Sequence, residues 1–281
     1  MCKGDDQLKI NILMDNNTYI DQYYLGEPAV SYYIEVDDKK ILFDCGYSDA
    51  FIKNAENMDI DLNKIDTIVL SHGHNDHTRG LIYLDKKINL SKPQLIAHPG
   101  CFEAKYCDGQ FIGAPYTLQD MYRFNYTPSK TPYEISKNCV FLGEIPELID
   151  FEPRYAIGVK EDLELCCSEF FSKDYILDDS AVVLKTKDGL FIVTGCSHSG
   201  ICNIIEYAKK VCSDDRIIGV LGGFHLFDID DRLSKTIDYL EKENINKVYP
   251  CHCVSLKAKA EMIKRLNVEE VGVGLEIFIK M

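Results

Sequence analysis

The feature that most constrains this chain is the sequence Ser-His-Gly-His-Asn-Asp-His at residues 71–77. The apolar run at 67–70 comes directly before it and is typical of a buried strand, and the Gly after the first His indicates a turn. Imidazoles this crowded would repel one another when protonated and would gain nothing in packing. Because imidazole and carboxylate are ligands for zinc, manganese or iron, the heptad predicts a metal site.

The rest of the chain alternates predicted strands and helices. We expect strands at 9–14, 32–36, 40–43, 67–70, 181–185, 190–193, 216–221, 247–249 and 271–279. Apolar spacing predicts a helix that carries Phe51 and Ala55 and begins at Ser48, and a late helix that carries Leu256, Ala260 and Ile263. Two halves, each with strands and then helices, predict an α/β fold with two sheets packed face to face and helices outside.

Residues 98–175 interrupt this alternation, and they hold 14 of the 30 aromatic residues and 6 of the 9 prolines. One interpretation is a small added core that stabilises the fold. The other is a cap that supplies aromatic walls for a substrate, since binding pockets are mostly apolar. The two are compatible, so we expect a single domain over 1–281 with an insertion or cap at about 98–175.

The heptad resembles the signature His-x-His-x-Asp-His of the metallo-β-lactamase superfamily, and Ile-Leu-Phe-Asp-Cys-Gly at 41–46 resembles that superfamily's early strand. Further motifs resemble the subgroup of metal-dependent hydrolases related to a ribofuranosylaminobenzene-phosphate (dihydropterin) synthase. They are Phe-Leu-Gly-Glu-Ile-Pro at 141–146, Thr-Gly-Cys-Ser-His-Ser-Gly at 194–200, Gly-Gly-Phe-His at 222–225 and Pro-Cys-His-Cys at 250–253. The resemblance implies an αββα four-layer sandwich.

The resemblance also implies where the other metal ligands lie, because His198 and His252 stand where the superfamily places its downstream ligands. The resulting hypothesis is a two-metal site. Its first ion is held by His72, His74 and His198, and its second by Asp76, His77 and His252. Asp44 is expected to hydrogen-bond a ligand imidazole and fix its tautomer rather than to bind metal.

One position departs from the superfamily pattern, because many relatives place a bridging Asp where this chain has Cys196. Cys196 either binds as a thiolate, which favours zinc over a harder metal, or points into the core. In the second case Asp178 and Asp179 are the carboxylates best able to replace it. The metal count therefore stays open.

Two further histidines, His98 and His225, also follow strand-like runs, and strand ends commonly face a shared crevice. We interpret His225 as an acid, a substrate contact or a support for a ligand. His98 is either another ligand or simply the start of the insertion.

The predicted activity is hydrolysis by a metal-activated hydroxide, because a zinc-bound water has a pKa of about 7. Asp76 would orient the hydroxide, and zinc is expected, as two ions, with manganese or iron as alternatives. Expected substrates are a small-molecule ester, thioester, lactone or phosphoester, including a pterin-related phosphorylated compound. The alternatives are a nuclease or phosphodiesterase of the same superfamily, and a non-hydrolytic metal-binding or redox protein.

Composition indicates which binding partners and which cellular compartment to expect for this chain. The formal net charge is −14, with Lys and Arg scattered, which argues against nucleic-acid binding. The polar N-terminus and the lack of any apolar stretch of about 18 residues predict a protein outside the membrane. Twelve cysteines without a Cys-x-x-Cys pair indicate reduced thiols and cytoplasmic residence. The sequence names neither the substrate nor the oligomeric state.

Overall fold

The computed structural model describes residues 7–87, 92–117, 122–161 and 171–281, and within them the strands form three sheets. The first sheet has the order β17-β1-β2-β3-β4-β5-β8. Its strands are β1 Gln7–Met14, β2 Ser31–Val36, β3 Lys39–Phe43, β4 Thr67–Val69, β5 Gln94–Ala97, β8 Asn125–Pro128 and β17 Glu276–Lys280. The second has the order β16-β15-β14-β13-β10-β9. Its strands are β9 Tyr133–Ser136, β10 Cys139–Phe141, β13 Ala181–Thr186, β14 Gly189–Thr194, β15 Ile217–Gly222 and β16 Lys247–Pro250.

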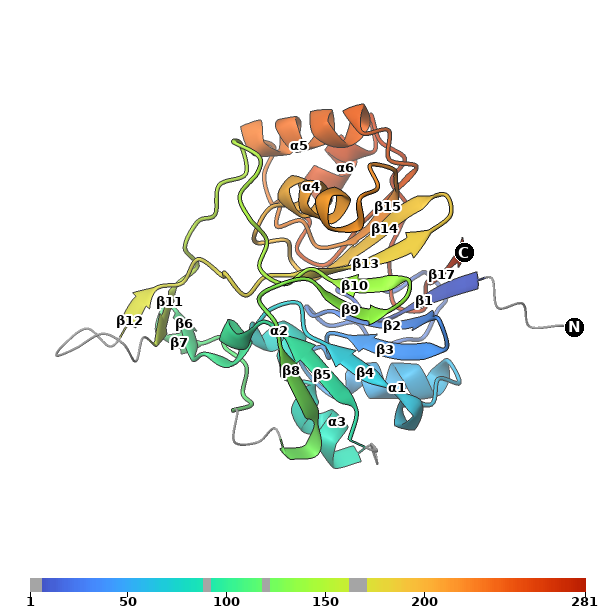
Figure 1. Ribbon diagram of the computed structural model, residues 1–281, viewed down its shortest axis with the longest axis vertical. Coiled ribbons are helices and arrows are strands. Elements are labelled where there is room, and N and C mark those ends of the chain that lie inside the picture. The colour runs from blue at the N-terminus through green and yellow to red at the C-terminus, as the bar shows by residue number, and fades with distance from the viewer. Residues whose placement is uncertain (1–6, 88–91, 118–121, 162–170) are drawn as a thin grey trace, which may run out of the picture.

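The two sheets pack face to face, and helices cover both outer faces (Figure 1). The outer face of the first sheet carries α1 Ala50–Asn57 and α3 Leu81–Lys87, and that of the second carries α4 Ile201–Cys212, α5 Asp231–Lys242 and α6 Leu256–Met262. The predicted α/β fold class, an αββα sandwich, is confirmed. In the described part of the chain, no helix is long and apolar enough to cross a membrane.

Alternation along each strand builds the three apolar layers of the core. In β2, Tyr32 and Ile34 enter the cluster between the sheets, while Tyr33 packs on the helix side. In β13, Val182 lies between the sheets and Val183 packs against the helices. Because both faces of these strands are buried, their sequences read as apolar runs. Such side chains dominate stability, since truncating a large buried one to Ala costs about 2–5 kcal/mol.

Three local predictions differ from the structure. Helix α6 buries Ala258 and Met262, whereas the predicted Leu256 and Ile263 are 84% and 61% exposed and Ala260 is also exposed. A helix so rich in Lys and Ala has no clear apolar stripe, so its spacing misidentified the buried face. Helix α1 has Asp49 rather than Ser48 at its N-cap, although the Ser48 hydroxyl accepts a hydrogen bond from the Ala50 N–H at 3.1 Å. The closing strand begins at Glu276, not at residue 271.

The segment 98–175, predicted as an insertion, contributes to all three sheets among the described residues. Strand β8 pairs with β5 in the first sheet, and β9 and β10 join the second. The third sheet has the order β12-β11-β6-β7 and projects to one side of the sandwich (Figure 1). Its strands are β6 Lys105–Cys107, β7 Gln110–Phe111, β11 Val159–Glu161 and β12 Phe171–Lys173. The single-domain assignment stays a prediction.

Parallel pairing gathers the ends of several strands at one edge of the sandwich. Strand β4 runs parallel to β3 and β5 in the first sheet, and β15 runs parallel to β14 and β16 in the second. The carboxyl ends of parallel strands meet at the same edge, where ligands commonly bind. The segments that follow these strands carry nearly all the predicted site residues.

Candidate metal centre

The heptad leaves β4 through a tight loop and enters the short helix α2 Asn75–Thr78. Gly73 is required here, because a Cβ would overlap the Cys101 carbonyl and crowd the Lys105 side chain at 2.9 Å. The Gly73 N–H donates to Asp178 Oδ2 at 2.7 Å, and Lys105 Nζ lies 2.8 Å from Asp178 Oδ1 and 2.9 Å from Asp174 Oδ2. This buried ion triad ties the loop to the third sheet.

The first donor cluster consists of His72, His74 and His198, whose metal-binding atoms all lie within 4.8 Å of one another. His72 Nε2 is 3.0 Å from His74 Nδ1, and the His198 ring centre is 4.8 Å from that of His72. His74 Nε2 and both ring nitrogens of His198 are buried without a hydrogen-bond partner in the structure. Buried polar atoms are almost always paired, so a metal ion fits this cluster.

Burial keeps these three imidazoles neutral. It lowers the pKa of His72 and His198 well below the usual value and brings that of His74 to about 4. A neutral imidazole has a lone pair to donate, which metal binding requires.

The second cluster consists of Asp76, His77 and His252. Asp76 Oδ2 lies 3.6 Å from His77 Nε2 and 3.3 Å from His252 Nε2. Burial opposes protonation of His77, but Asp76 and Asp44 outweigh it and raise its pKa. Burial alone would favour the protonated acid at Asp76, yet the neighbouring His77 and His252 lower its pKa well below the usual value. Asp76 is therefore a carboxylate across the neutral pH range.

Side chains behind the clusters fix the orientation of the rings. Asp44 Oδ2 contacts His77 Nδ1 at 2.7 Å, as the role expected for it requires, and its other oxygen accepts the Ser71 N–H at 2.7 Å. Asn16 Oδ1 lies 3.0 Å from His252 Nδ1. These contacts turn the Nε2 atoms of His77 and His252 toward Asp76, and such partners typically support metal ligands.

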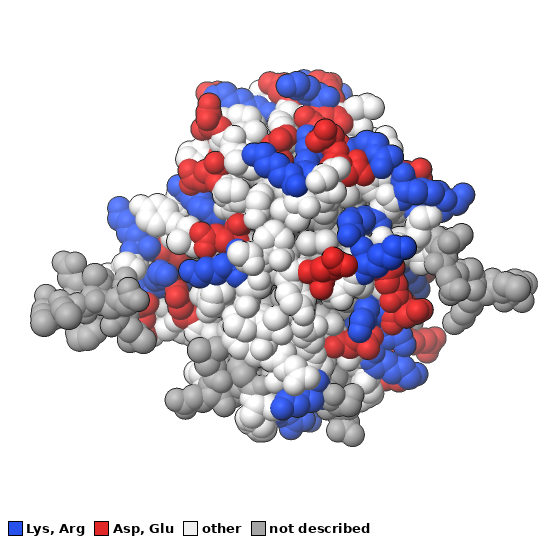
Figure 2. Space-filling view, viewed as in Figure 1, with Lys and Arg blue, Asp and Glu red and all other residues white. Residues whose placement is uncertain are grey.

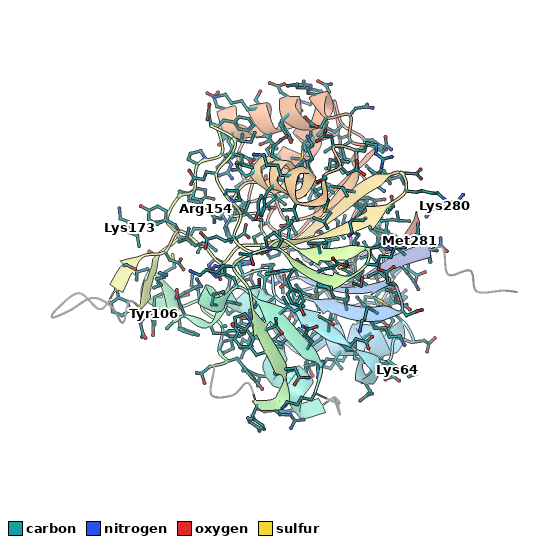
Figure 3. All side chains as sticks on the ribbon, in the orientation of Figure 1. Lys64, Tyr106, Arg154, Lys173, Lys280 and Met281 are labelled. Carbon is teal, nitrogen blue, oxygen red and sulfur yellow. The ribbon has the colours of Figure 1, made fainter. Side chains whose placement is uncertain are left out.

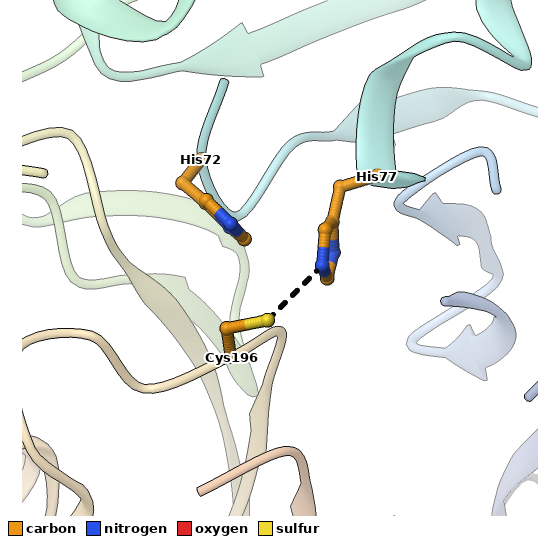
Figure 4. A group of neighbouring side chains, drawn as sticks. All are labelled: His72, His77 and Cys196. Carbon is orange, nitrogen blue, oxygen red and sulfur yellow. Dashed lines mark hydrogen bonds between the residues drawn. The ribbon is translucent and has the colours of Figure 1, made fainter. Parts of the chain in front are cut away.

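Cys196 lies against the second cluster rather than in the core between the sheets. Its sulfur is 3.2 Å from His77 Nε2 and also groups with His72 (Figure 4). Cys253 Sγ completes a further donor group with Cys196 and His252. The sequence indicated Cys253 only as a neighbour of predicted ligands. No motif singled out Asn16, although it belongs to a polar run directly after β1.

His225 lies beside the first cluster, with its ring centre 4.6 Å from that of His198. The Tyr155 hydroxyl forms a short hydrogen bond with His225 Nδ1. Burial and the nearby Arg232 lower the pKa of His225 to about 4, so its ring is neutral at neutral pH. Tyr155 belongs to the predicted insertion and was not singled out by the sequence.

A cavity of about 710 Å³ opens over both clusters. Its lining includes His74, Asp76, His198, His225 and His252, together with Gln110 and Phe111 of the third sheet. The third sheet therefore forms one wall of the site.

Three predicted candidates lie elsewhere. His98 accepts the Gly100 N–H at 3.0 Å and contacts Glu144 at 3.2 Å, so it caps a short helix. Asp178 is held by Lys105, and Asp179 accepts the Ser199 N–H at 2.9 Å. Neither carboxylate belongs to a donor cluster of the described residues. Both oxygens of Asp178 are held by protein donors, whereas Asp179 Oδ1 is buried without a hydrogen-bond partner among the described residues.

Residues 25–135 match the family described as the metallo-β-lactamase superfamily. The chain is 32% identical over 268 residues to an uncharacterized protein of Methanocaldococcus jannaschii, covering 94% of this chain and 98% of that protein. It belongs to the metallo-β-lactamase superfamily. The chain is also 32% identical to the 7,8-dihydropterin-6-methyl-4-(β-D-ribofuranosyl)-aminobenzene-5'-phosphate synthase of the same organism, covering 90% of each protein.

Among solved structures, the chain resembles Tm1679, described as a metal-dependent hydrolase of the β-lactamase superfamily. The TM-score is 0.81 at 29% identity, and the match covers 98% of this chain and 100% of that one. Proteins of this superfamily generally bind divalent metals and are mostly hydrolases.

Proposed function

We propose that this chain is a metal-dependent hydrolase of a small molecule that contains an ester, thioester, lactone or phosphoester bond. The observation that carries the proposal is the convergence of two donor clusters at the wall of one cavity of about 710 Å³. Zinc is the metal we propose, with one ion in each cluster, because imidazole, carboxylate and the thiol of Cys196 are its usual ligands.

A bound divalent ion would supply Lewis acidity, which polarises the scissile group and makes water more acidic. The remaining functions belong to the chain itself. Neutral His72, His74 and His198 provide lone pairs, while Asp44 and Asn16 hold the rings that face the second cluster.

Asp76 orients the attacking water in this proposal. Its lowered pKa makes it a weak base, so it accepts a hydrogen bond from the water better than it removes a proton. His225 contacts the substrate oxygen. A hydrogen bond donated by Tyr155 to Nδ1 leaves the proton of the neutral ring on Nε2, where it can be donated.

The cavity wall indicates the kind of substrate. Phe111 and Phe227 are apolar parts of the lining, and no Lys or Arg is found among the described lining residues. The wall itself therefore suits an uncharged ester or lactone. A phosphoester would depend on the metal ions to balance its charge.

A second candidate is a synthase reaction on a phosphorylated, pterin-related substrate. The observation that favours it is the 32% identity to the dihydropterin-related synthase. A nuclease fits less well, because the net charge is −14 and the face in Figure 2 has Lys and Arg interspersed with Asp and Glu. A non-hydrolytic binding protein is disfavoured, because every residue that the heptad is expected to contribute to metal binding is present in this chain.

The test is elemental analysis of the chain purified without chelator, together with a screen of ester, lactone, thioester, phosphodiester, cyclic-nucleotide and phosphorylated pterin substrates. Two transition-metal ions per chain and turnover of one ester class support the hydrolase. Turnover of the phosphorylated pterin alone favours the synthase. A chain that binds no metal even after reconstitution contradicts both.

A further inference from the structure

Two thiols from distant parts of the sequence meet beside the second cluster. The sulfur atoms of Cys196 and Cys253 and a ring nitrogen of His252 all lie within 4.8 Å of one another. The two cysteines are 57 positions apart, and both are free. Figure 4 shows the Cys196 sulfur directed at His77, which lies 3.2 Å away.

The surrounding backbone is shaped to hold the Cys253 sulfur there. A Cβ on Gly223 would overlap Cys253 Sγ, so a glycine at this position leaves the space that the sulfur fills. The His225 backbone N–H donates a hydrogen bond to Cys253 Sγ at 3.3 Å. Hydrogen bonds of this kind tune metal-bound cysteine sulfurs.

We propose that Cys253 is a metal ligand and that, with Cys196 and His252, it gives the second metal position two sulfur donors and a preference for thiophilic ions. The inference rests on the proposed function only in requiring that the clusters bind metal. Thiolates are soft ligands, whereas carboxylates suit harder ions such as manganese. The site therefore selects zinc or cadmium over manganese, and each bound thiol releases its proton to solvent.

The geometry is compatible with one ion shared by both sulfurs. Because a zinc–sulfur bond is about 2.3 Å, two sulfurs on one ion are at most about 4.6 Å apart. The two sulfur atoms lie within 4.8 Å of each other, so at most a small side-chain adjustment brings both onto one ion. Neither cysteine is held in a disulfide that would have to be broken.

The first test is a Co²⁺ titration of the full chain after removal of metal with a chelator. A sulfur-to-cobalt charge-transfer band should develop, and Cys253→Ser should lose about half of its intensity, because two sulfurs contribute. The double variant Cys196→Ser/Cys253→Ser should lose all of it. Cys107→Ser is the matched control: Cys107 lines the same cavity but belongs to no donor cluster in the described residues, so its band should be unchanged.

Metal preference gives a second readout. In competition between Cd²⁺ and Mn²⁺, Cys253→Ser should reduce the preference for Cd²⁺ by at least about tenfold, since even indirect partners of a metal are worth that much. An unchanged cobalt band in Cys253→Ser, with two Co²⁺ ions still bound, overturns the inference and leaves the proposed hydrolase standing. A wild-type chain that binds no Co²⁺ overturns both.

The wild-type chain offers a test that does not depend on folding of a variant. Iodoacetamide should alkylate Cys253 more slowly when Co²⁺ is bound, whereas Cys107 should react equally with and without it. Mass spectrometry of the digested chain measures both sites in one sample. Equal alkylation of Cys253 in the two conditions contradicts its role as a ligand.

Discussion

The two halves of the sandwich supply metal donors in different ways. The first half concentrates His72, His74, Asp76 and His77 in one loop after β4, whereas the second half presents two donors after β14 and two after β16. The first arrangement is local in the sequence, because its four donors lie within residues 72–77. The second exists only when three strands have paired in the correct register.

The contacts and backbone conformations that hold the donor side chains in place also differ between the two halves. The first loop is held by the buried Lys105–Asp174–Asp178 triad and by Asp44. Positive φ angles are more frequent beside the second half's donors, at Ser197 (55°), His225 (50°) and His252 (49°), than beside those of the first half, where Asp44 adopts 57°. Such strain costs about 1–3 kcal/mol per residue and persists only where surrounding contacts impose it. The second half therefore depends more on tertiary structure, and four experiments test this comparison.

The largest effect should come from removing donors of the first loop. His74→Ala/Asp76→Ala takes one ligand from each cluster, so hydrolysis should fall by about ten-thousandfold, which corresponds to several kcal/mol of lost metal catalysis. Steady-state kinetics measures the loss, and circular dichroism checks that the chain is folded. His98→Asn is the control, because it keeps a hydrogen-bond acceptor for the Gly100 N–H outside both clusters. Full activity in the double variant would mean that the site is elsewhere.

The next largest effect concerns the support of that loop. Lys105→Met leaves Asp174 and Asp178 buried without their cation, which should destabilise the fold by about 3–5 kcal/mol. Lys160→Met is the matched control on the third sheet, because the partly exposed Lys160–Glu103 pair should contribute only about 0–1 kcal/mol. Urea unfolding of both variants measures the difference. Equal stabilities would show that the triad does not support the loop.

The two clusters should lose metal separately when second-half ligands are removed. His198→Ala should weaken binding of one ion and His252→Ala that of the other, each by about a hundredfold. Elemental analysis after dialysis should then give one ion per chain for each variant. If one variant loses both ions, the clusters are not independent, and the comparison between the halves fails.

The smallest effect is the acid dependence of the first loop's support. Burial would raise the pKa of Asp178, but Lys105 outweighs it, so the pKa is lowered. The folded state then binds fewer protons than the unfolded one, so this contribution is complete above the unfolded pKa of about 3.9 and is lost as the pH falls through the lower folded pKa. Between pH 5 and pH 3, the metal-free wild type should lose more stability than Asp178→Asn, by about 1 kcal/mol. Parallel urea curves would contradict this linkage.

Much of the fold could be predicted because its signals are local. Both faces of the central strands are buried, so β2 and β14 read as apolar runs in the sequence. The buried face of helix α6 could not be predicted from the sequence in this way. Its Leu256 is 84% exposed, because it lies in the first turn on the side away from the sheet.

The residues of the candidate site also differ in how far the sequence alone could identify them. Asp44 was expected from the resemblance of residues 41–46 to the superfamily's early strand, and it contacts His77. His98 also follows a strand, but it caps a short helix and contacts Glu144, and it belongs to no group of three donors among the described residues. Cys253 and Asn16 reach the site from opposite ends of the chain. The sequence indicated Cys253 only as a neighbour of His252, and no motif singled out Asn16.

The sequence by itself determined the αββα architecture, the superfamily and the candidate ligands of one loop, because periodicity and a contiguous motif depend only on near neighbours along the chain. The tertiary structure alone decided which carboxylates are hydrogen-bonded by other protein groups and which two thiols lie together at the second cluster. It also decided that the third sheet lines one side of the cavity. Those properties depend on distances between residues far apart in the chain, and they are set by strand pairing and core packing.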